Sequence, residues 1–309
     1  MLAWIGGEPS PRRATHPPDQ KGLFDPCPHR GSHGKLGRDR DKRRKLIGDS
    51  HMFRGLRFEV LGPVRGFTGE TELHLGSPQQ RGVLAMLLLA RGRQVSMDGL
   101  IDGLWGADVP RAAGGTIRTY ISRLRHCLDA DAGRGELIES IGDGYLVPRD
   151  AAVLDLDQFE EGLGKARTAC QCQATAQAVS VLRDTLGLWR GTALAGVPGP
   201  YAESRRVRLA ELHLVATEEK LAMDIAIGQH GEAVAELREL LAEHPFREGL
   251  SELLMLGLYR SGRQAEALAV FNAVRQQLGA ELGIDPGLAL QEMHQRVLQA
   301  DQHLMGVAV

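Results

Sequence analysis

A stripe of hydroxyl-bearing and cationic side chains recurs at helical spacing between residues 111 and 128. The apolar residues of this stretch are separated by four, three and four positions, so they share one face of a helix. They are Ile117, Ile121, Leu124 and Leu128. Hydroxyl and guanidinium groups on the opposite face suit hydrogen bonds to phosphates and to base edges in a major groove. The spacing therefore predicts a helix over residues 111–129 that can read duplex DNA.

The candidate DNA-contacting residues lie away from this apolar face, with one arginine at the start of the helix and one serine downstream of it. They are Arg111, Thr116, Arg118, Thr119, Tyr120, Ser122, Arg123, Arg125, His126 and Ser140. Arg118 and Arg125 fall on one shoulder of the helix, and Tyr120 falls on the other. An ordinary amphipathic helix with a solvated basic face has the same pattern, so the neighbouring elements must decide between the two interpretations.

The flanking segments predict the element order of a winged helix-turn-helix. Residues 56–75 alternate weakly in polarity between glycines and a proline, which indicates short antiparallel strands. Ser77, which precedes a proline, and Ser96 are capping signals for two helices, the second of which ends at Gly106. Residues 137–147 predict a hairpin with a Gly-Asp-Gly turn. The helix over 111–129 is then the reader and this hairpin the wing.

The second half of the chain predicts an architecture built almost entirely from helices. Between residues 156 and 300, helix formers dominate, and Gly and Pro occur only at breaks. The segments GQHGEAV and GRQAEAL begin at Gly228 and Gly262, an offset of 34 residues that is the period of tetratricopeptide repeats. A helical bundle with an accidental repeat match is the alternative. The predicted fold is mainly α with a small β component: a winged helix followed by an α-helical, tetratricopeptide-like repeat domain.

The sequence also resembles a known family in one colinear order. TIRTYISRLR with the following hairpin resembles the OmpR/PhoB-type winged helix, a two-component-like output domain, in the form found in the Streptomyces antibiotic regulatory protein (SARP) family. LWRG, LYRSGRQAEALAVF and ELGIDPGLALQEMHQRVL resemble that family's bacterial transcriptional activator domain. The chain is thus identified as a small-type member. Its predicted domains are residues 53–150, residues 151–300 and a C-terminal tail over 301–309, and a fragment ending at Asp150 is expected to fold alone.

The resemblance implies a function that the residue pattern alone does not give. It implies a transcriptional activator that binds direct repeats near the −35 region of promoters, side by side with a second subunit. It also implies recruitment of RNA polymerase through the sigma subunit, and targets in a secondary-metabolite (antibiotic) gene cluster. The positions that match DNA-contacting places in related reader helices are Thr116, Tyr120, Ser122, Arg123 and Arg125. The alternative is a tetratricopeptide-type scaffold whose winged helix only docks proteins.

Sequence signals for other protein classes are absent. The chain has no GxxxxGK[ST], GxSxG or HExxH motif, so no catalytic residue, enzyme activity or cofactor is expected. Cys170-Gln-Cys172 lacks a second pair or clustered histidines, so no metal site is expected. Four irregularly spaced cysteines, the lack of a signal peptide and the lack of a long apolar run indicate a cytoplasmic, nucleoid-associated protein with no membrane partner.

Charge is unevenly distributed along the chain. Residues 1–51 hold 11 basic and 6 acidic residues, a net charge of +5, whereas residues 52–150 are neutral overall and residues 151–309 carry −7. A neutral winged helix implies modest, strongly salt-dependent binding by one subunit, and hence cooperation between subunits on double-stranded promoter DNA. Residues 1–52 are predicted to be a disordered basic tail, or else to precede a translation start at Met52.

Overall fold

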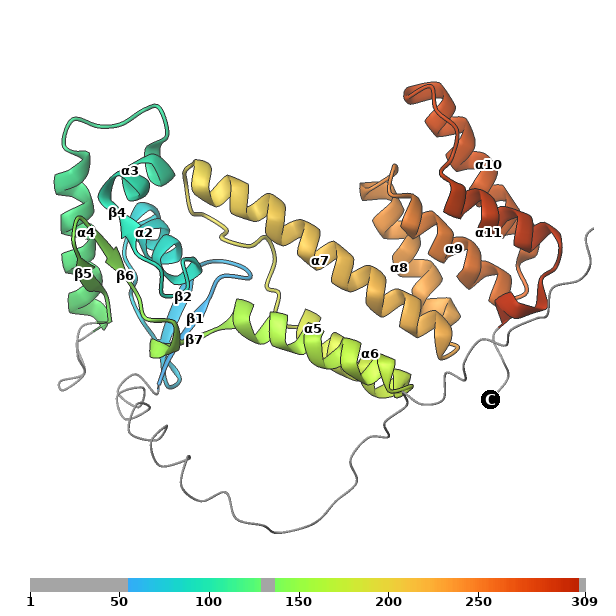
Figure 1. Cartoon of the computed structure of the whole chain (residues 1–309), viewed down its shortest axis with the longest axis horizontal. Helices are drawn as coiled ribbons and strands as arrows, with labels where there is room; N and C mark the ends of the chain where they lie inside the picture. The colour runs from blue at the N-terminus through green and yellow to red at the C-terminus, as the bar shows by residue number, and fades with distance from the viewer. Residues whose placement is uncertain (1–54, 129–136, 306–309) are drawn as a thin grey trace, which may run out of the picture. The chain divides into compact units, whose positions relative to one another are not determined.

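The computed structural model describes residues 55–128 and 137–305, which are coloured in Figure 1. The predicted basic tail over 1–52, the alternative start at Met52 and the last four residues of the chain lie outside the described residues. The elements of the first half are β1 (Leu56–Glu59), β2 (Arg65–Thr68), β3 (Thr71–Glu72), α2 (Pro78–Leu89), β4 (Val95–Ser96), α3 (Met97–Trp105), α4 (Ala113–Leu128), β5 (Glu139–Ile141), β6 (Gly144–Leu146), the short 3₁₀ turn η1 (Arg149–Ala151) and β7 (Val153–Leu154).

Two small sheets frame the helices of this half. The first has the order β3-β2-β1-β7, and β1 pairs antiparallel with β2 so that Phe58 lies opposite Gly66. The antiparallel strands expected between residues 56 and 75 are therefore confirmed. The fourth strand, β7, pairs parallel with β1 and was not predicted. The second sheet, of order β4-β6-β5, contains the predicted hairpin.

The helices of the first half begin and end where the capping residues predict. The Ser77 hydroxyl accepts a hydrogen bond from the Gln80 amide at the start of α2, and the Ser96 hydroxyl accepts one from the Gly99 amide at the start of α3. Gly106 ends α3 with a φ of 56°, a backbone conformation that favours glycine. The winged-helix order of elements is confirmed.

The second half is helical and contains the expected repeat. Its elements are α5 (Asp155–Gln171), α6 (Thr175–Leu186), α7 (Pro200–Ala226), α8 (His230–Glu243), α9 (Glu248–Arg260), α10 (Gln264–Glu281), α11 (Leu288–Leu298) and the 3₁₀ turn η2 (Gln302–Met305). Gly228 and Gly262 have φ values of 90° and 75°, and they precede α8 and α10 at equivalent places. Ala233 and Ala267 are both buried one turn into these helices, where their small size lets neighbouring helices approach. Within the described ranges, no helix is both long and apolar enough to cross a bilayer.

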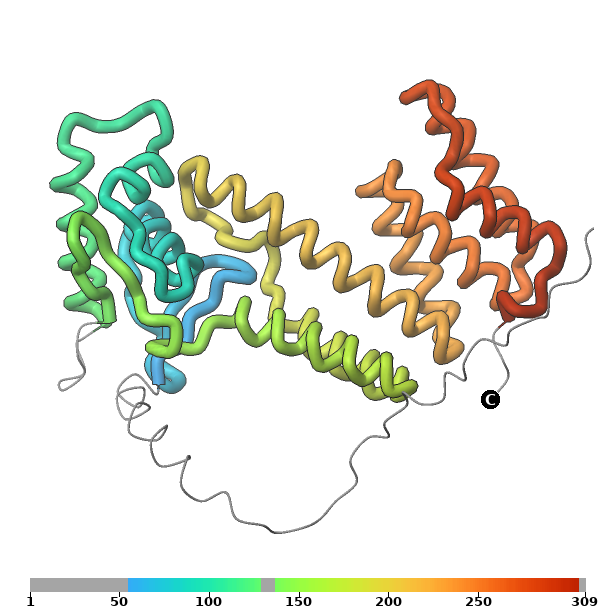
Figure 2. Tube along the Cα trace, in the orientation of Figure 1, coloured from blue at the N-terminus to red at the C-terminus, as the bar shows by residue number. Residues whose placement is uncertain are grey.

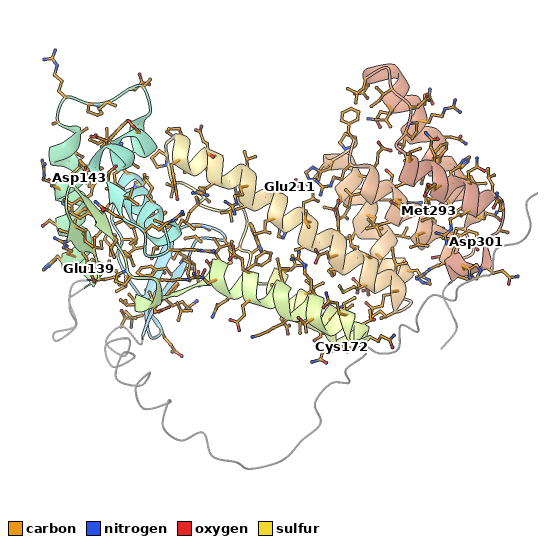
Figure 3. The ribbon with its side chains drawn as sticks, viewed as in Figure 1. Glu139, Asp143, Cys172, Glu211, Met293 and Asp301 are labelled. Atoms are coloured by element: carbon orange, nitrogen blue, oxygen red, sulfur yellow. The ribbon has the colours of Figure 1, made fainter. Side chains whose placement is uncertain are left out.

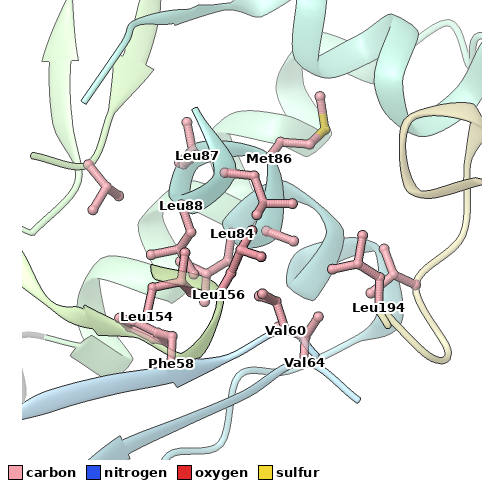
Figure 4. Close-up of a cluster of buried hydrophobic side chains, with 14 of the residues drawn as sticks. Phe58, Val60, Val64, Leu84, Met86, Leu87, Leu88, Leu154, Leu156 and Leu194 are labelled. Atoms are coloured by element: carbon pink, nitrogen blue, oxygen red, sulfur yellow. The ribbon is translucent and has the colours of Figure 1, made fainter. Parts of the chain in front are cut away.

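One hydrophobic core runs through the winged helix and into the helical half without a break. Its buried residues extend along the chain from Leu56 to Ala216. Figure 4 shows Phe58 of β1 in one cluster with Leu84 of α2 and Leu156 of α5, and Leu194 of the α6–α7 loop lies at the other side of this cluster. A second core holds the later helices together, from Leu214 to Leu304. The helix α7, drawn in yellow in Figure 2, contributes residues to both cores.

A buried carboxylate joins the two halves of the sequence. Asp155, the first residue of α5, is 2% exposed. Its carboxylate oxygens accept hydrogen bonds from the Val60 amide at 2.9 and 3.0 Å and from the Leu61 amide at 3.1 Å. These amides follow directly after β1, where they have left the strand ladder and need an acceptor. Asp155 thus caps the end of β1.

The α6–α7 loop lies along the same stretch of chain. The Arg190 amide donates to the Leu61 carbonyl at 2.8 Å, and the Leu194 amide donates to the Val60 carbonyl at 3.0 Å. The Arg190 guanidinium lies 3.5 Å from Asp155 and 3.2 Å from the buried carboxylate of Glu59. The backbone after β1 is therefore clamped from two places in the helical half.

This packing affects the expectation that the winged helix folds without the helical half. The domain boundary at residue 150 remains a prediction, but the hydrophobic core does not stop there. A fragment ending at Asp150 would keep the strands that the sequence predicted, but it would lack β7 and the Asp155 cap, which lie beyond that residue. Without them, β1 loses a neighbouring strand and its terminal amides lose their acceptors.

Replacing Asp155 tests the importance of this cap. We expect Asp155→Ala to lower the free energy of unfolding by about 1–3 kcal/mol, because the Val60 and Leu61 amides stay buried without an acceptor. Urea denaturation measures the change. Asp150→Ala, an exposed neighbour on η1, is the control and should change stability by less than about 0.5 kcal/mol. Equal effects of the two substitutions would contradict the capping role.

The same carboxyl makes stability depend on pH. Burial raises the pKa of Asp155 from 3.8 to about 6, although the Val60 and Leu61 amides and Arg190 act against the shift. Because the folded state binds this proton more tightly than the unfolded chain, the contribution of Asp155 to stability falls as pH rises between these two values, and it is constant above about 6. Asp155→Asn should remove this slope, worth at most about 3 kcal/mol. The free energy of unfolding of both proteins is measured between pH 3.8 and about 6. If it changes with pH in parallel for the two proteins, Asp155 is not the source of the slope.

Candidate nucleic-acid interface

The predicted reader helix is α4, and its apolar stripe fixes its orientation. Ile117, Ile121, Leu124 and Leu128 are all buried in the first core, as the spacing predicted. This face packs against α2 and α3. At its back, the Cys127 thiol contacts the His74 carbonyl at 3.3 Å, and burial raises the pKa of this thiol. The opposite face of α4 is therefore turned outward by packing.

Most of the candidate contact residues lie on this outward face. The exposed ones are Arg111, Arg118, Thr119, Ser122, Arg123, His126 and Ser140, and Thr116, Tyr120 and Arg125 are partly buried. Within residues 55–128 and 137–305, no acidic side chain pairs with Arg111, Arg118 or Arg123. Three guanidinium groups are thus available for an anionic partner. When they bind one, no ion pair among the described residues has to break.

Two threonines on α4 have already committed their hydroxyl protons. The Thr116 hydroxyl donates to the Ala112 carbonyl at 3.1 Å, and the Thr119 hydroxyl donates to the Gly115 carbonyl at 3.0 Å. In this rotamer each side chain offers outward only a methyl group and oxygen lone pairs. Such groups suit a thymine methyl or a base amino group better than a phosphate, which needs a donor.

Tyr120 and Arg125 on the two shoulders of α4 contact other elements of the protein. The Tyr120 hydroxyl donates to Gln79 Oε1 of α2 at 2.6 Å. The Arg125 guanidinium donates to the Ile138 carbonyl at 2.6 and 2.9 Å and to the Ser140 hydroxyl at 2.8 Å. Tyr120 therefore ties the reader helix to α2, and Arg125 ties it to the first strand of the wing. These bonds position the surface whether or not either residue also touches DNA.

The wing is formed by β5 and β6 beside α4, and Figure 3 labels Glu139 and Asp143 on it. Gln94 Nε2 donates to the Ile141 carbonyl at 2.8 Å and to Asp143 Oδ1 at 3.2 Å, which braces the turn. Gly144 packs so closely on β4 that an added Cβ would lie 2.3 Å from the Val95 carbonyl oxygen. The tip carries an acidic side chain, so the wing has no strong charge attraction to phosphate at that point.

The sequence reasoning missed two glutamines at this site. Gln79 and Gln94 brace the reader helix and the wing, but a glutamine beside a capping serine or a short strand gives no sequence signal of that role.

Among the residues that the structure describes, no cluster of three or more His, Cys, Asp or Glu side chains could hold a metal ion. Cys170 and Cys172 are free thiols at the end of α5, and they are remote from α4 in the sequence.

Comparison with known proteins agrees with this architecture. Residues 70–147 match the family described as "Transcriptional regulatory protein, C terminal", and residues 154–298 match the "Bacterial transcriptional activator domain". The chain is 49% identical over 249 residues to the regulatory protein AfsR of Streptomyces griseus, which covers 81% of this chain and 25% of AfsR. It is 34% identical over 250 residues to the transcriptional regulator RedD of Streptomyces coelicolor, covering 78% of this chain and 70% of RedD.

A solved structure has the same fold. The structure of Mycobacterium tuberculosis EmbR, in complex with a low affinity phosphopeptide, is 33% identical to this chain with a TM-score of 0.75. The match covers 80% of this chain and 65% of that one. The chain spans about a quarter of the length of AfsR.

The fold and the site define a class of protein: winged-helix regulators in which an OmpR/PhoB-type domain is followed by a bacterial transcriptional activator domain of tetratricopeptide-like helices. RedD, of which this chain covers more than two thirds, belongs to the same class. The chain belongs to the Streptomyces antibiotic regulatory protein (SARP) family.

The contact between Arg125 and the wing gives a prediction that does not depend on DNA. Arg125→Ala removes charge-assisted hydrogen bonds that each stabilise by about 1.5–3 kcal/mol, so the backbone amides of β5 should exchange with solvent at least about tenfold faster. Hydrogen exchange followed by mass spectrometry measures the change. Arg123→Ala, an exposed arginine without such contacts, is the matched control and should leave the wing unchanged. Identical exchange in both variants would remove Arg125 as the positioning residue.

Proposed function

We propose that this protein is a transcriptional activator that binds promoter DNA through α4 and the wing. The observation that carries the proposal is the outward face of α4, where Arg118 and Arg123, which pair with no acidic side chain in the described part of the chain, lie among hydroxyl-bearing side chains. A buried apolar stripe holds this face outward, and hydrogen bonds through Tyr120 and Arg125 hold its flanks. A rigid helix that presents donors, acceptors and methyl groups has the elements needed to read base edges in a major groove.

The positions of the side chains along α4 support separate roles in the contact of phosphates and in the recognition of bases. Arg111 lies just before α4 and Arg118 lies in its first half, and both would contact phosphates, whereas Ser122, Arg123 and His126 lie further along the exposed face. Arg123 is the candidate for a bidentate contact to a guanine, because it is exposed and has no partner in the described part of the chain. Ser140 faces the same side through its bond to Arg125.

The finer parts of the proposal rest on family membership. In this proposal, two subunits bind direct repeats near the −35 region side by side, and the helical domain mediates their association and the recruitment of RNA polymerase through sigma. The targets are genes of a secondary-metabolite (antibiotic) cluster, and the protein works in the cytoplasm on the nucleoid. A neutral winged helix favours cooperation, because each subunit alone gains little from charge.

A gel-shift titration across salt concentrations tests the proposal. Duplexes with one or two copies of a short direct repeat, taken from promoters beside the gene, are compared with a scrambled duplex. A DNA-binding activator gives a steep loss of affinity with salt and a gain from the second repeat, and it raises transcription by purified RNA polymerase. A protein-docking scaffold gives neither sequence preference nor stimulation, and that result would refute the proposal.

Arg123→Ala is the sharpest variant for this experiment. We expect it to weaken specific binding by about 1–3 kcal/mol, the range of one good polar contact to a base, and to relax preference at one base pair. Arg208→Ala, an exposed arginine on α7, is the matched control and should bind as the parent does. Unchanged affinity of the Arg123→Ala protein, with its thermal midpoint intact, would exclude Arg123 from the interface.

A further inference from the structure

A large groove lies on α7 and involves none of the candidate DNA contacts. A cavity of about 1170 Å³ opens between the α6–α7 loop, the first half of α7 and the α8–α9 loop. Arg247 of the α8–α9 loop binds Glu211 and Glu218 of α7 at 2.6 and 2.8 Å, which holds that loop against the helix. Glu211 is labelled on α7 in Figure 3. A second cavity of about 400 Å³ between α6 and α8 continues the groove, because the two share five lining residues.

The length of the groove indicates what kind of ligand it fits. Along α7 the lining runs from Arg206 to Lys220, which at 1.5 Å per residue is about 21 Å. That distance matches about six residues of extended polypeptide. Sites for small molecules are usually clefts or cavities of about 300–1,000 Å³, smaller than this groove and its continuation together. A peptide segment therefore fits this groove better than a small molecule does.

One end of the groove is apolar and aromatic. The Trp189 ring lies against the His213 ring, with centroids 4.5 Å apart, in the wall of the cavity. At the rim, the large apolar side chains of Val207 and Phe246 are 74% and 42% exposed. The Trp189 indole nitrogen is shielded from solvent and has no acceptor among the described residues. This end can bury an apolar side chain and has one donor left to satisfy.

The other end of the groove is acidic. Glu239 and Glu243 lie one turn apart on α8, where Glu239 lines only the second cavity and Glu243 lines both, and neither is paired with any cation in the described part of the chain. The cations nearby are already engaged, as Lys220 is with Glu236 at 2.6 Å. Arg183, Arg206 and Arg247 are likewise engaged, with Asp224, the Val197 carbonyl and Glu218. An approaching segment therefore meets two unpaired carboxylates.

We propose that this groove binds a peptide segment of a partner protein, with apolar side chains at the Val207–Phe246 end and a lysine or arginine at the Glu239–Glu243 end. The apolar anchor covers Val207 and Phe246, and the basic residue neutralises the two carboxylates, so that the two ends of the groove set the direction of the segment. The site is separate from the DNA-binding surface, so the proposal does not depend on the proposed function.

Phage display of short random peptides on the purified full chain tests this proposal. We expect enriched peptides to combine apolar residues with lysine or arginine a few positions away. Val207→Asp should weaken their binding at least about tenfold, and the double variant Glu239→Lys/Glu243→Lys should do the same. Fluorescence anisotropy with the enriched peptides gives the affinities.

Two matched variants act as controls. Leu288→Asp replaces an apolar residue that is 77% exposed on α11, and Glu292→Lys reverses an exposed charge on the same helix. Both should bind the enriched peptides as the parent does. The proposal fails if no peptide is enriched, if the enriched peptides are acidic, or if the groove variants bind no more weakly than the controls. Thermal midpoints of all variants distinguish loss of the groove from loss of the fold.

Discussion

The structure depends on the carboxylate of Asp155, which ends the sheet of the winged helix from a position at the start of the helical half. Strand β1 would otherwise finish with two amides turned into a hydrophobic core, where neither water nor another strand could satisfy them. The raised pKa of this carboxyl shows that its burial carries an electrostatic cost. The position of Asp155 explains why an acidic residue occurs there. Its carboxylate accepts hydrogen bonds from two successive amides and also faces Arg190. The winged helix is thereby built together with α5 and the α6–α7 loop.

This construction bears directly on the candidate DNA-binding surface. The helix α4 is oriented by its packing on α2 and α3, and these helices share their core with β1, α5 and α7. Contacts on the two flanks, through Tyr120 and Arg125, restrict rotation of α4 and set the distance to the wing. The outward face is then left with few internal partners. Side chains that do little for stability are the ones available for recognition.

Local signals in the sequence predicted much of the fold. The serines before α2 and α3, the glycine after α3 and the apolar stripe of α4 each act within a few residues, and each was placed correctly. The repeat in the second half was visible because Gly228 and Gly262 occupy equivalent backbone positions. Such features depend on local geometry, which neighbouring residues determine.

The features that escaped prediction all depend on distant partners. Strand β7 has only two residues, too few for any periodic pattern, and it exists because β1 has a free edge. Asp155 looked like an ordinary acidic residue at the start of a helix, and 94 residues of sequence separate it from Leu61. For Arg125, the sequence showed a cation on the shoulder of a helix. Only the position of Ile138 and Ser140 shows that it also braces the wing.

The helix α7 has a consequence for how this protein loses its structure. Its 27 residues place Leu209 and Ala216 in one core and Leu214 and Leu221 in the other, so the two cores share this one helix. Unfolding of either core would expose the apolar side chains that α7 contributes to it. A helix that has lost the packing of one face is less stable, and it then supports the remaining core less well. The two halves of the chain thus form one cooperative unit, in which disorder at the far end of the helical repeats lowers the stability of the winged helix.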